Sequence, residues 1–106
     1  MSLRIYQDKI DEWANQFETP YWHPLAQLAR LMEEVGEFSR EINAIYGEKP
    51  KKSTEENKEM NDELGDIMFT VICMANNLGI NLDEAFDRVL EKYKIRDIDR
   101  YKKKIC

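Results

Sequence analysis

Apolar side chains recur along most of the chain at steps of three and four residues, the spacing of a helix with one buried face. The first segment with this spacing is predicted to start at a capping Ser2 and to run to about Glu18. It ends at Thr19-Pro20, because a residue that precedes proline avoids the helical region. Its apolar stripe consists of Tyr6, Ile10, Trp13 and Phe17.

A second helix is predicted from Pro24, which suits the first turn of a helix, to Gly47, which closes it. A third is predicted to follow a polar loop, to start at a capping box of Ser53 and Glu56, and to end before Gly79. The second stripe consists of Leu28, Leu31, Val35, Phe38, Ile42 and Ile45, and the third of Leu64, Ile67, Val71, Ala75 and Leu78.

A fourth helix is predicted to start at Asn81, which forms a capping-box-like pair with Glu84, and to continue through Ile98 to Tyr101. Its inward face is predicted to consist of Leu82, Phe86, Val89 and Tyr93. No segment has the strict alternation of a β-strand, and the sequence has no glycine-rich phosphate loop. The pattern therefore predicts an all-α protein, a bundle of four to five helices in a single domain over residues 1–106.

Size and composition fit a charged helical domain with a modest core. The chain has 106 residues, 42% of them hydrophobic and 35% charged, so association with further copies is expected to bury more surface. The net charge of −5 argues against binding a nucleic-acid duplex, because that affinity comes largely from neutralised phosphates. The N-terminus is too polar for a signal peptide, and no stretch has the apolar length of a membrane span.

Cys73 and Cys106 form no C-x-x-C pair, so we expect a reducing, cytoplasmic protein with Cys73 in its core.

One acidic pattern occurs twice. Residues 33–37 and 62–66 both read acid–acid–apolar–Gly–acid. In each copy two acids are spaced i,i+3, Glu34 with Glu37 and Glu63 with Asp66, which places their Cβ atoms roughly 5–6 Å apart on one side of a helix. Like charges at that distance repel, and a glycine inside a helix costs about 1 kcal/mol relative to alanine. We interpret the glycines as positions where two helices approach closely, so that the four carboxylates converge.

Four converging carboxylates predict a metal site, because they repel one another unless a cation lies between them. All-oxygen ligation suits a hard divalent ion, Mg²⁺ or alternatively Mn²⁺. A di-iron site is a poor fit, because it needs Glu-x-x-His pairs and His23, the one histidine, lies in neither motif. The alternative is a pair of solvated acidic edges in a highly charged chain. The matched repeat of both pairs favours the metal site.

Two further groups are candidates for contact with a nucleotide. Lys92 and Arg96 are spaced i,i+4 on the fourth helix and could neutralise the oxygens of a polyphosphate. On spacing alone, solvated charges or ion pairs with neighbouring acids explain them more simply. The residues that could stack on a base are Trp13, Phe17, Tyr21, Trp22 and His23. Trp13 and Phe17 are more simply explained as core residues, whereas Trp22 and His23 lie in the loop before the acidic helix. The alternative for His23, which precedes a proline, is a cap on that helix.

Two runs of the chain carry a resemblance to a known family. They are Leu31-Met32-Glu33-Glu34-Val35-Gly36-Glu37 and, after a gap of 25 residues from 38 to 62, Glu63-Leu64-Gly65-Asp66-Ile67-Met68-Phe69. They resemble the E-E-x-x-E and E-x-x-D signature of the MazG-type all-α nucleoside triphosphate pyrophosphohydrolases. Residues 75–80 and 91–97 are similar to that family's third and fourth helices. Residues 21–25 are similar to its small single-domain YpjD-like subfamily.

The resemblance implies hydrolysis of a nucleoside or deoxynucleoside triphosphate to the monophosphate and pyrophosphate, with Mg²⁺. By position it implies Glu34, Glu37, Glu63 and Asp66 as metal ligands, with Glu34 and Glu37 as the catalytic residues. It implies Lys92 and Arg96 as phosphate contacts, and Asn76 as a further substrate contact. Family members work as dimers or dimers of dimers with sites near subunit interfaces, so a homodimer or homotetramer is expected.

Our hypothesis from the sequence is that Mg²⁺ on the four carboxylates binds the triphosphate and orients a water toward the α-phosphorus. One of the carboxylates, for which Glu37 is a candidate, would accept the proton of that water, and Lys92 and Arg96 would hold the charge of the leaving pyrophosphate. The expected role is cleansing of the nucleotide pool. Two alternatives stay open. One is a phosphoribosyl-ATP pyrophosphohydrolase, and the other is a non-catalytic helical interaction module whose acids bind a cation for structure only.

Overall fold

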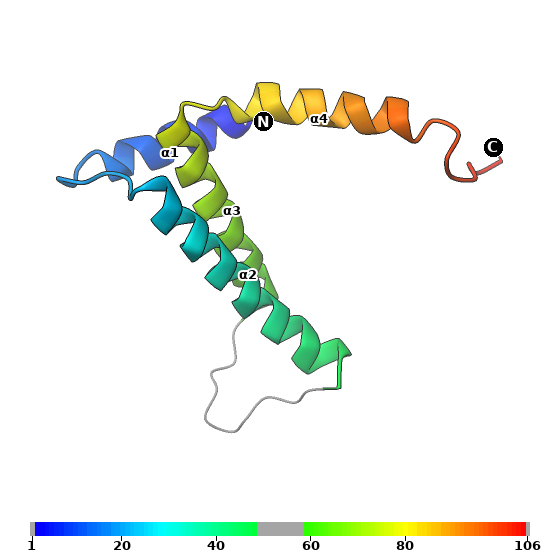
Figure 1. Ribbon diagram of the computed structural model, residues 1–106, viewed down its shortest axis with the longest axis horizontal. Helices are drawn as coiled ribbons and strands as arrows, with labels where there is room; N and C mark the ends of the chain where they lie inside the picture. Colours follow the sequence, from blue (N-terminus) through cyan, green and yellow to red (C-terminus); the bar gives the residue numbers. More distant parts are fainter. Residues whose placement is uncertain (1, 49–58, 106) are drawn as a thin grey trace.

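Four helices make up the computed structural model, which describes residues 2–48 and 59–105 (Figure 1). They are α1 (Leu3–Ala14), α2 (Pro24–Tyr46), α3 (Met60–Leu78) and α4 (Leu82–Arg96). Within these ranges the chain forms no strand, so the all-α prediction is confirmed. None of the described helices is both long enough and apolar enough to cross a membrane.

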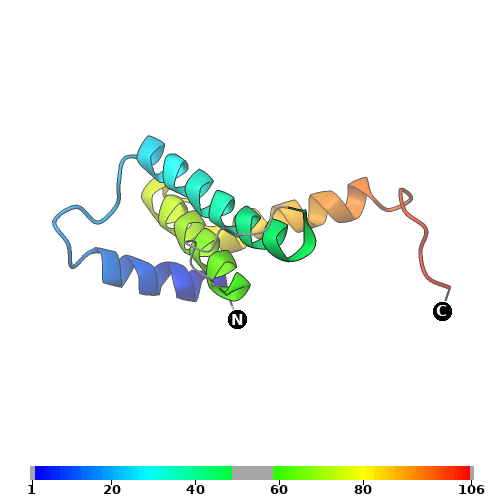
Figure 2. The same cartoon turned by 90° about the horizontal axis from the view of Figure 1, so that it is seen from below.

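The helices are arranged around α3. Helix α3 packs antiparallel along α2. Helix α1 lies against the other side of α3, near the C-terminal end of α3 (Figures 1 and 2). The fourth helix leaves the junction of α1 and α3 and points away from the pair formed by α2 and α3 (Figure 1). The predicted four-to-five-helix bundle is therefore not formed within one chain, because α4 contacts little besides α1.

Helix ends predicted from local signals agree well with the structure. The second helix starts at Pro24 and stops before Gly47, as predicted. Gly79 ends α3 in the left-handed region, with φ +68°, and the next N–H, that of Ile80, donates to the carbonyl of Ala75 at 2.8 Å. Asn81 caps α4, since its Oδ1 accepts from the backbone N–H groups at positions 83 and 84 at 3.0 and 3.3 Å.

The first helix differs from its prediction at both ends. Ser2 makes no capping hydrogen bond. Asp83 of α4 replaces it, because its carboxylate accepts from the N–H groups of Leu3 and Arg4 at 2.8 and 3.3 Å. The helix ends at Ala14 instead of Glu18, where Asn15 Nδ2 donates to the carbonyl of Asp11 at 2.7 Å and starts a turn. Because Asp83 lies far from Leu3 in the sequence, the residues near the start of α1 do not reveal that Asp83 caps this helix.

Two further predictions about helix ends have different outcomes. The fourth helix stops at Arg96, and the chain turns over residues 97–100, so the predicted continuation to Tyr101 is wrong. Without packing partners, the apolar side chains beyond Arg96 have nothing to hold them in a helix. The capping box of Ser53 and Glu56 lies outside the described residues, as does Cys106. Helix α3 starts at Met60, after Glu59 in an extended conformation, so the predicted start of the third helix at Ser53 is wrong.

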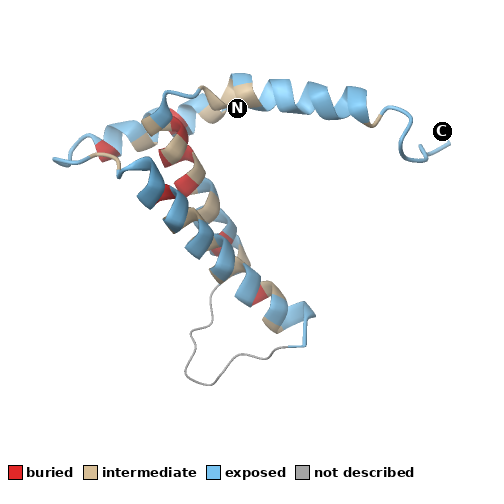
Figure 3. Cartoon of the chain, in the orientation of Figure 1, coloured by how far each residue is buried: buried red, intermediate tan, exposed pale blue. Residues whose placement is uncertain are grey.

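The buried apolar core of the described residues is small. It consists of Ala14, Ile72, Cys73 and Ala75, which confirms Cys73 as a core residue. The predicted inward face of α4 is wrong for the single chain, because no residue of α4 is buried and Phe86 is 60% exposed (Figure 3). The radius of gyration is 17.7 Å, whereas a compact domain of this length would have about 13 Å.

Buried amides hold α1 to α3. Gln7, which is 2% exposed, donates from Nε2 to Asn76 Oδ1 at 3.0 Å and to the carbonyl of Ile80 at 2.8 Å, and accepts from the N–H of Leu82 at 3.0 Å. Asn76 Nδ2 donates to the carbonyl of Gln7 and to Tyr21 Oη, both at 3.0 Å. Burial and the hydrogen bond to Asp11 raise the pKa of Tyr21 to about 12. These bonds fix the loop that joins α1 to α2.

Candidate metal and nucleotide site

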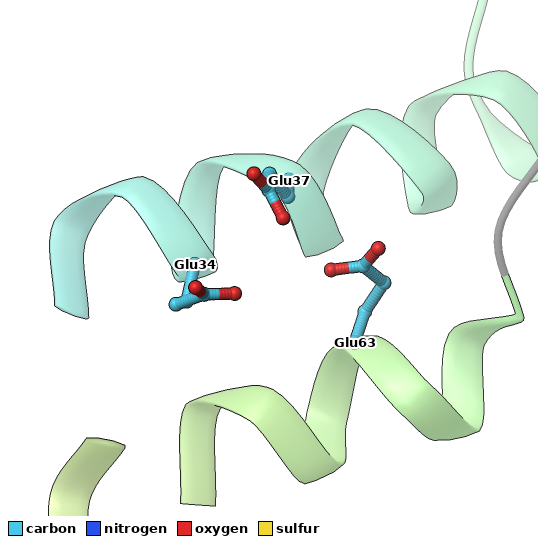
Figure 4. Close-up of side chains that lie close together, drawn as sticks. All are labelled: Glu34, Glu37 and Glu63. Atoms are coloured by element: carbon cyan, nitrogen blue, oxygen red, sulfur yellow. The ribbon is translucent and has the colours of Figure 1, made fainter. Parts of the chain in front are cut away.

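Three carboxylates converge between α2 and α3. Glu34 and Glu37 project from α2 and Glu63 from α3, and one oxygen of each lies within 4.8 Å of the others (Figure 4). The i,i+3 spacing of the two α2 residues puts them on the side of the helix that faces α3. Their neighbour Glu33 is exposed. We call Glu34, Glu37 and Glu63 the acidic cluster.

The acidic cluster is withdrawn from water. Glu63 is 1% exposed, and the side chain of Glu34 is 15% exposed. Glu34 Oε2 is buried and accepts no hydrogen bond from the described part of the chain. Burial raises the pKa of Glu34, and the charges of Glu37 and Asp66 raise it further, while Arg30 lowers it. The charged form of Glu34 is therefore held under repulsion that a cation would relieve.

The donor set of the acidic cluster fits a hard divalent cation. It offers only carboxylate oxygens, which Mg²⁺ and Mn²⁺ prefer. A buried carboxylate oxygen with no donor is costly for a fold unless a ligand satisfies it, because burial removes it from water. The fit therefore depends on the unsatisfied Glu34 Oε2 as well as on the convergence of the three residues.

Asp66, the fourth predicted ligand, lies at the edge of the acidic cluster. It is exposed and does not belong to the group within 4.8 Å, but its charge contributes to the raised pKa of Glu34. The structure thus brings three of the four predicted metal ligands together and leaves the fourth beside them. Glu41, one turn beyond Glu37, is also buried, at 5% exposure.

The glycines of the two acidic motifs do not act as expected within one chain. Gly36 and Gly65 are exposed, and a Cβ added at either position would meet nothing within 4 Å. The expectation that they let α2 and α3 approach closely is therefore wrong, because both face away from the contact between these helices. Gly65 borders an apolar groove of about 380 Å³ between α1 and α3.

Replacing either glycine by alanine is expected to raise the free energy of unfolding by about 0.5–1 kcal/mol, because alanine favours the helix and meets no clash. Chemical denaturation of Gly36→Ala and Gly65→Ala at low protein concentration measures the change. Gly36→Ala serves as the control for Gly65→Ala. Destabilisation by Gly65→Ala alone would show that another copy of the chain approaches the backbone there.

The predicted phosphate contacts are not beside the acidic cluster. Lys92 and Arg96 lie on α4, which points away from the end of α2 and α3 that holds the cluster (Figure 1). Their cationic groups lie over the ring of Tyr93, at 5.1 and 4.3 Å from its centroid. Arg96 also forms two hydrogen bonds with Asp97, at 3.0 and 3.2 Å, which lower the pKa of Asp97.

The other three predicted substrate contacts, His23, Asn76 and Trp22, each have a different role in the structure. His23 Nδ1 accepts from the N–H of Leu25 at 3.1 Å, so its side chain caps α2, the alternative that the sequence left open. Asn76 uses its amide in the bonds to Gln7 and Tyr21 described above. Trp22 is 53% exposed and lies under the guanidinium of Arg30, 5.4 Å from the ring centroid.

A cavity lies one helical turn from Glu34, and its walls include Trp22, which the sequence marked as a candidate for stacking on a base. Its volume is about 230 Å³, and it lies between the end of α1, the loop that joins α1 to α2, and helices α2 and α3. Its principal walls are Trp13, Phe17, Trp22, Gln27, Arg30 and Phe69. We call it the aromatic cavity. The sequence signal that could have located it is Arg30, which lies one turn before Glu34 and contacts it, with Nε 3.8 Å from Oε1.

Known proteins similar to this chain include two from Bacillus subtilis (strain 168). YpjD is 48% identical over 103 residues, which cover 97% of this chain and 93% of YpjD. YvdC is 27% identical over 92 residues, which cover 77% of this chain and 87% of YvdC.

Two crystal structures share the fold. That of YpjD from Bacillus subtilis gives a TM-score of 0.78 at 48% identity, over 88% of this chain and 95% of the other. The structure of the Bacillus-conserved MazG protein, a nucleotide pyrophosphohydrolase, gives a TM-score of 0.75 at 40% identity, over 88% of this chain and 90% of the other. Residues 23–101 match the MazG nucleotide pyrophosphohydrolase domain, a span that holds the whole acidic cluster. The chain therefore belongs to the MazG nucleotide pyrophosphohydrolase family, which comprises hydrolases of pyrophosphate bonds.

Proposed function

We propose that this protein hydrolyses a nucleoside or deoxynucleoside triphosphate to the monophosphate and pyrophosphate, with Mg²⁺ as the cofactor. The observation that carries the proposal is the acidic cluster, in which three carboxylates lie within 4.8 Å of one another and Glu63 is 1% exposed. A cation between these carboxylates would relieve the repulsion that contributes to the raised pKa of Glu34. Membership of a pyrophosphohydrolase family supports the same chemistry.

Each carboxylate has a proposed role. Glu34, Glu37 and Glu63 would hold the ion, with Asp66 at the edge as a further ligand. The ion, when bound, would supply positive charge against the triphosphate oxygens. Glu37 would accept the proton of the water whose oxygen attacks the α-phosphorus. The bond from that phosphorus to the bridging oxygen breaks, and pyrophosphate leaves with the bonding electrons.

Lys92 and Arg96 require a second copy of the chain to reach the site. Within one chain α4 points away from the acidic cluster, yet the charge of a leaving pyrophosphate calls for cations. We place these two side chains, as proposed, against the acidic cluster of a partner copy. A homodimer is the simplest assembly with this exchange, and a homotetramer can contain it twice.

The surface of the chain supports such an assembly. Large hydrophobic side chains are exposed on each described helix, among them Tyr6 on α1, Leu28 on α2 and Met68 on α3. Obligate homodimers bury apolar surface of this kind. The exposed apolar side of α4, which includes Phe86, Val89 and Tyr93, and the apolar groove between α1 and α3 are the surfaces that a second copy would cover.

A pyrophosphate-release assay across the ribo- and deoxyribonucleoside triphosphates, with and without Mg²⁺, tests the proposed function. The expected products are monophosphate and pyrophosphate in equal amounts, formed only with the metal. Release of orthophosphate instead would place the cut at the other anhydride bond and contradict the proposal. Binding of Mg²⁺ with no product from any nucleotide would favour the non-catalytic alternative.

A further inference from the structure

The aromatic cavity lies one helical turn from Glu34 along α2 and one turn from Asp66 along α3. On α2, Arg30 lies one turn before Glu34, with Nε 3.8 Å from Oε1. On α3, Thr70 lies one turn after Asp66 and donates from Oγ1 to its carbonyl at 2.9 Å. One helical turn is about 5.4 Å, so a group in the cavity would be a close neighbour of anything held by the cluster. In a nucleotide, the group at that position relative to the phosphates is the nucleoside.

The walls of the cavity suit a flat, conjugated ring. Trp13 packs edge-on against Phe17 and Phe69, with centroids 5.3 and 5.6 Å apart and interplanar angles of 73° and 71°. Arg30 lies over Trp22 and Phe69, with its guanidinium 5.4 and 5.8 Å from the two ring centroids. Stacking on aromatic rings favours any nucleobase, so the walls explain binding but do not select a base.

The polar groups left for a ligand in the cavity are mainly donors. Gln27 Oε1 accepts from Asn77 Nδ2 at 3.1 Å, and the same Nδ2 donates to the carbonyl of Trp22 at 3.0 Å. This arrangement leaves the Nε2 donors of Gln27 on the other side of the amide, where they form no hydrogen bond with the described residues. Thr70, which is 1% exposed, uses its hydroxyl proton in the hydrogen bond to the backbone carbonyl of Asp66.

Arg30 is the strongest of these donors. A guanidinium has five N–H groups and no acceptor. Its only ion pair among the described residues is the contact with Glu34, and at 3.8 Å this is longer than a hydrogen bond. Arg30 therefore has donors available to a ligand while the aromatic rings hold its plane in place.

We propose that Arg30 makes the protein selective for 6-oxopurine nucleotides, those with guanine or hypoxanthine, over adenine nucleotides. The proposal rests on the proposed function and names its substrate class. Arginine pairs with the adjacent O6 and N7 acceptors of a 6-oxopurine through two hydrogen bonds. Adenine presents an amino group where the oxygen would be, so donor faces donor and the pair is lost.

The first experiment compares ITP with ATP, which differ only at the purine 6-position and the protonation of N1. The expected kcat/KM ratio is about 10- to 100-fold in favour of ITP. 7-Deaza-GTP, which lacks the N7 acceptor, is expected to lose a similar factor relative to GTP. Equal kcat/KM values for ITP and ATP would overturn the selectivity, while the release of pyrophosphate from both would leave the proposed function intact.

The second experiment replaces Arg30 by glutamine, the side chain that pairs with the N6 and N7 edge of adenine. Arg30→Gln is expected to reverse the preference, so that ATP exceeds ITP. If Arg30 served only to position Glu34, the variant would slow both substrates by the same factor and leave their ratio unchanged. That result would contradict the proposal.

Binding measured without turnover tests the preference for a base independently of the proposed reaction. Both tryptophans of the chain, Trp13 and Trp22, line the cavity, so a base that enters should change the intrinsic fluorescence. The probes are the α,β-methylene analogues of GTP and ATP, which resist cleavage. Tighter binding of the guanine analogue supports the selectivity even if no nucleotide is hydrolysed. Equal affinities of the two analogues overturn it.

Discussion

Glu37→Gln and Glu63→Gln are each expected to lower kcat for pyrophosphate release by at least about 10²- to 10⁴-fold. Glutamine keeps the shape of the side chain but removes the charge that would hold a cation and, at Glu37, the base that would accept a proton. Because both residues belong to a group within 4.8 Å, the loss of either charge weakens the whole acidic cluster. Pyrophosphate release measured beside circular dichroism separates loss of chemistry from loss of fold.

Metal binding provides a second measurement on the same variants. For the unaltered protein, Mg²⁺ at a hundredfold excess over its Kd is expected to stabilise the fold by about 2.7 kcal/mol. The two variants should lose most of this gain, and Glu34→Gln should raise the stability of the metal-free protein, because it removes a buried charge under repulsion. Glu33→Gln, at an exposed position on the same helix, is the matched control. Full turnover in the Glu63 variant would remove the acidic cluster from the mechanism.

Phe86→Asp is expected to dissociate the assembly and to reduce turnover with it. Phe86 is 60% exposed in the single chain, and burying a phenylalanine side chain contributes roughly 1.5–3 kcal/mol in each copy. A charge at that position in both copies should raise the dissociation constant of a dimer by about 10²- to 10⁴-fold. Sedimentation velocity over a range of protein concentrations measures the change.

The neighbouring Asp87 provides a control on the same turn of α4. Asp87→Ala changes an exposed polar residue and should leave the sedimentation behaviour as it is. If the Phe86 variant were monomeric yet fully active, the delivery of Lys92 and Arg96 by a partner copy would be excluded. If the unaltered chain sedimented as a monomer at all concentrations, the apolar side of α4 would need another explanation.

Local signals account for the helix boundaries that were predicted correctly. Pro24, Gly79 and Asn81 act on the backbone within a few residues of themselves, so a sequence pattern is enough to place them. The ends that were mispredicted depend on other parts of the molecule. Asp83 caps α1 from a distance of about eighty residues along the chain, and α4 stops where it has no neighbour to pack against.

The features of the candidate site also fall into two groups, those that follow from spacing along one helix and those that depend on packing between helices. Spacing of i,i+3 was sufficient to put Glu34 and Glu37 on one side of α2, because that follows from helix geometry alone. The rotation of α3 about its own axis decided that Glu63 is buried in the acidic cluster while Asp66 stays exposed at its edge. Packing also turned Gly36 and Gly65 outward, against the expectation from the repeated motif.

By itself, the sequence determined that the chain is helical, where α2 begins and ends, where α3 ends and α4 begins, and which acids share a helix face. These properties arise from hydrogen bonds and side-chain spacing within a few residues. Only the tertiary structure decided that α4 leaves the other helices, that Asn76 and His23 serve the fold, and that Arg30 and Gln27 border an aromatic cavity. Those outcomes depend on how the helices are rotated and placed against one another, which is set by contacts between residues far apart in the chain.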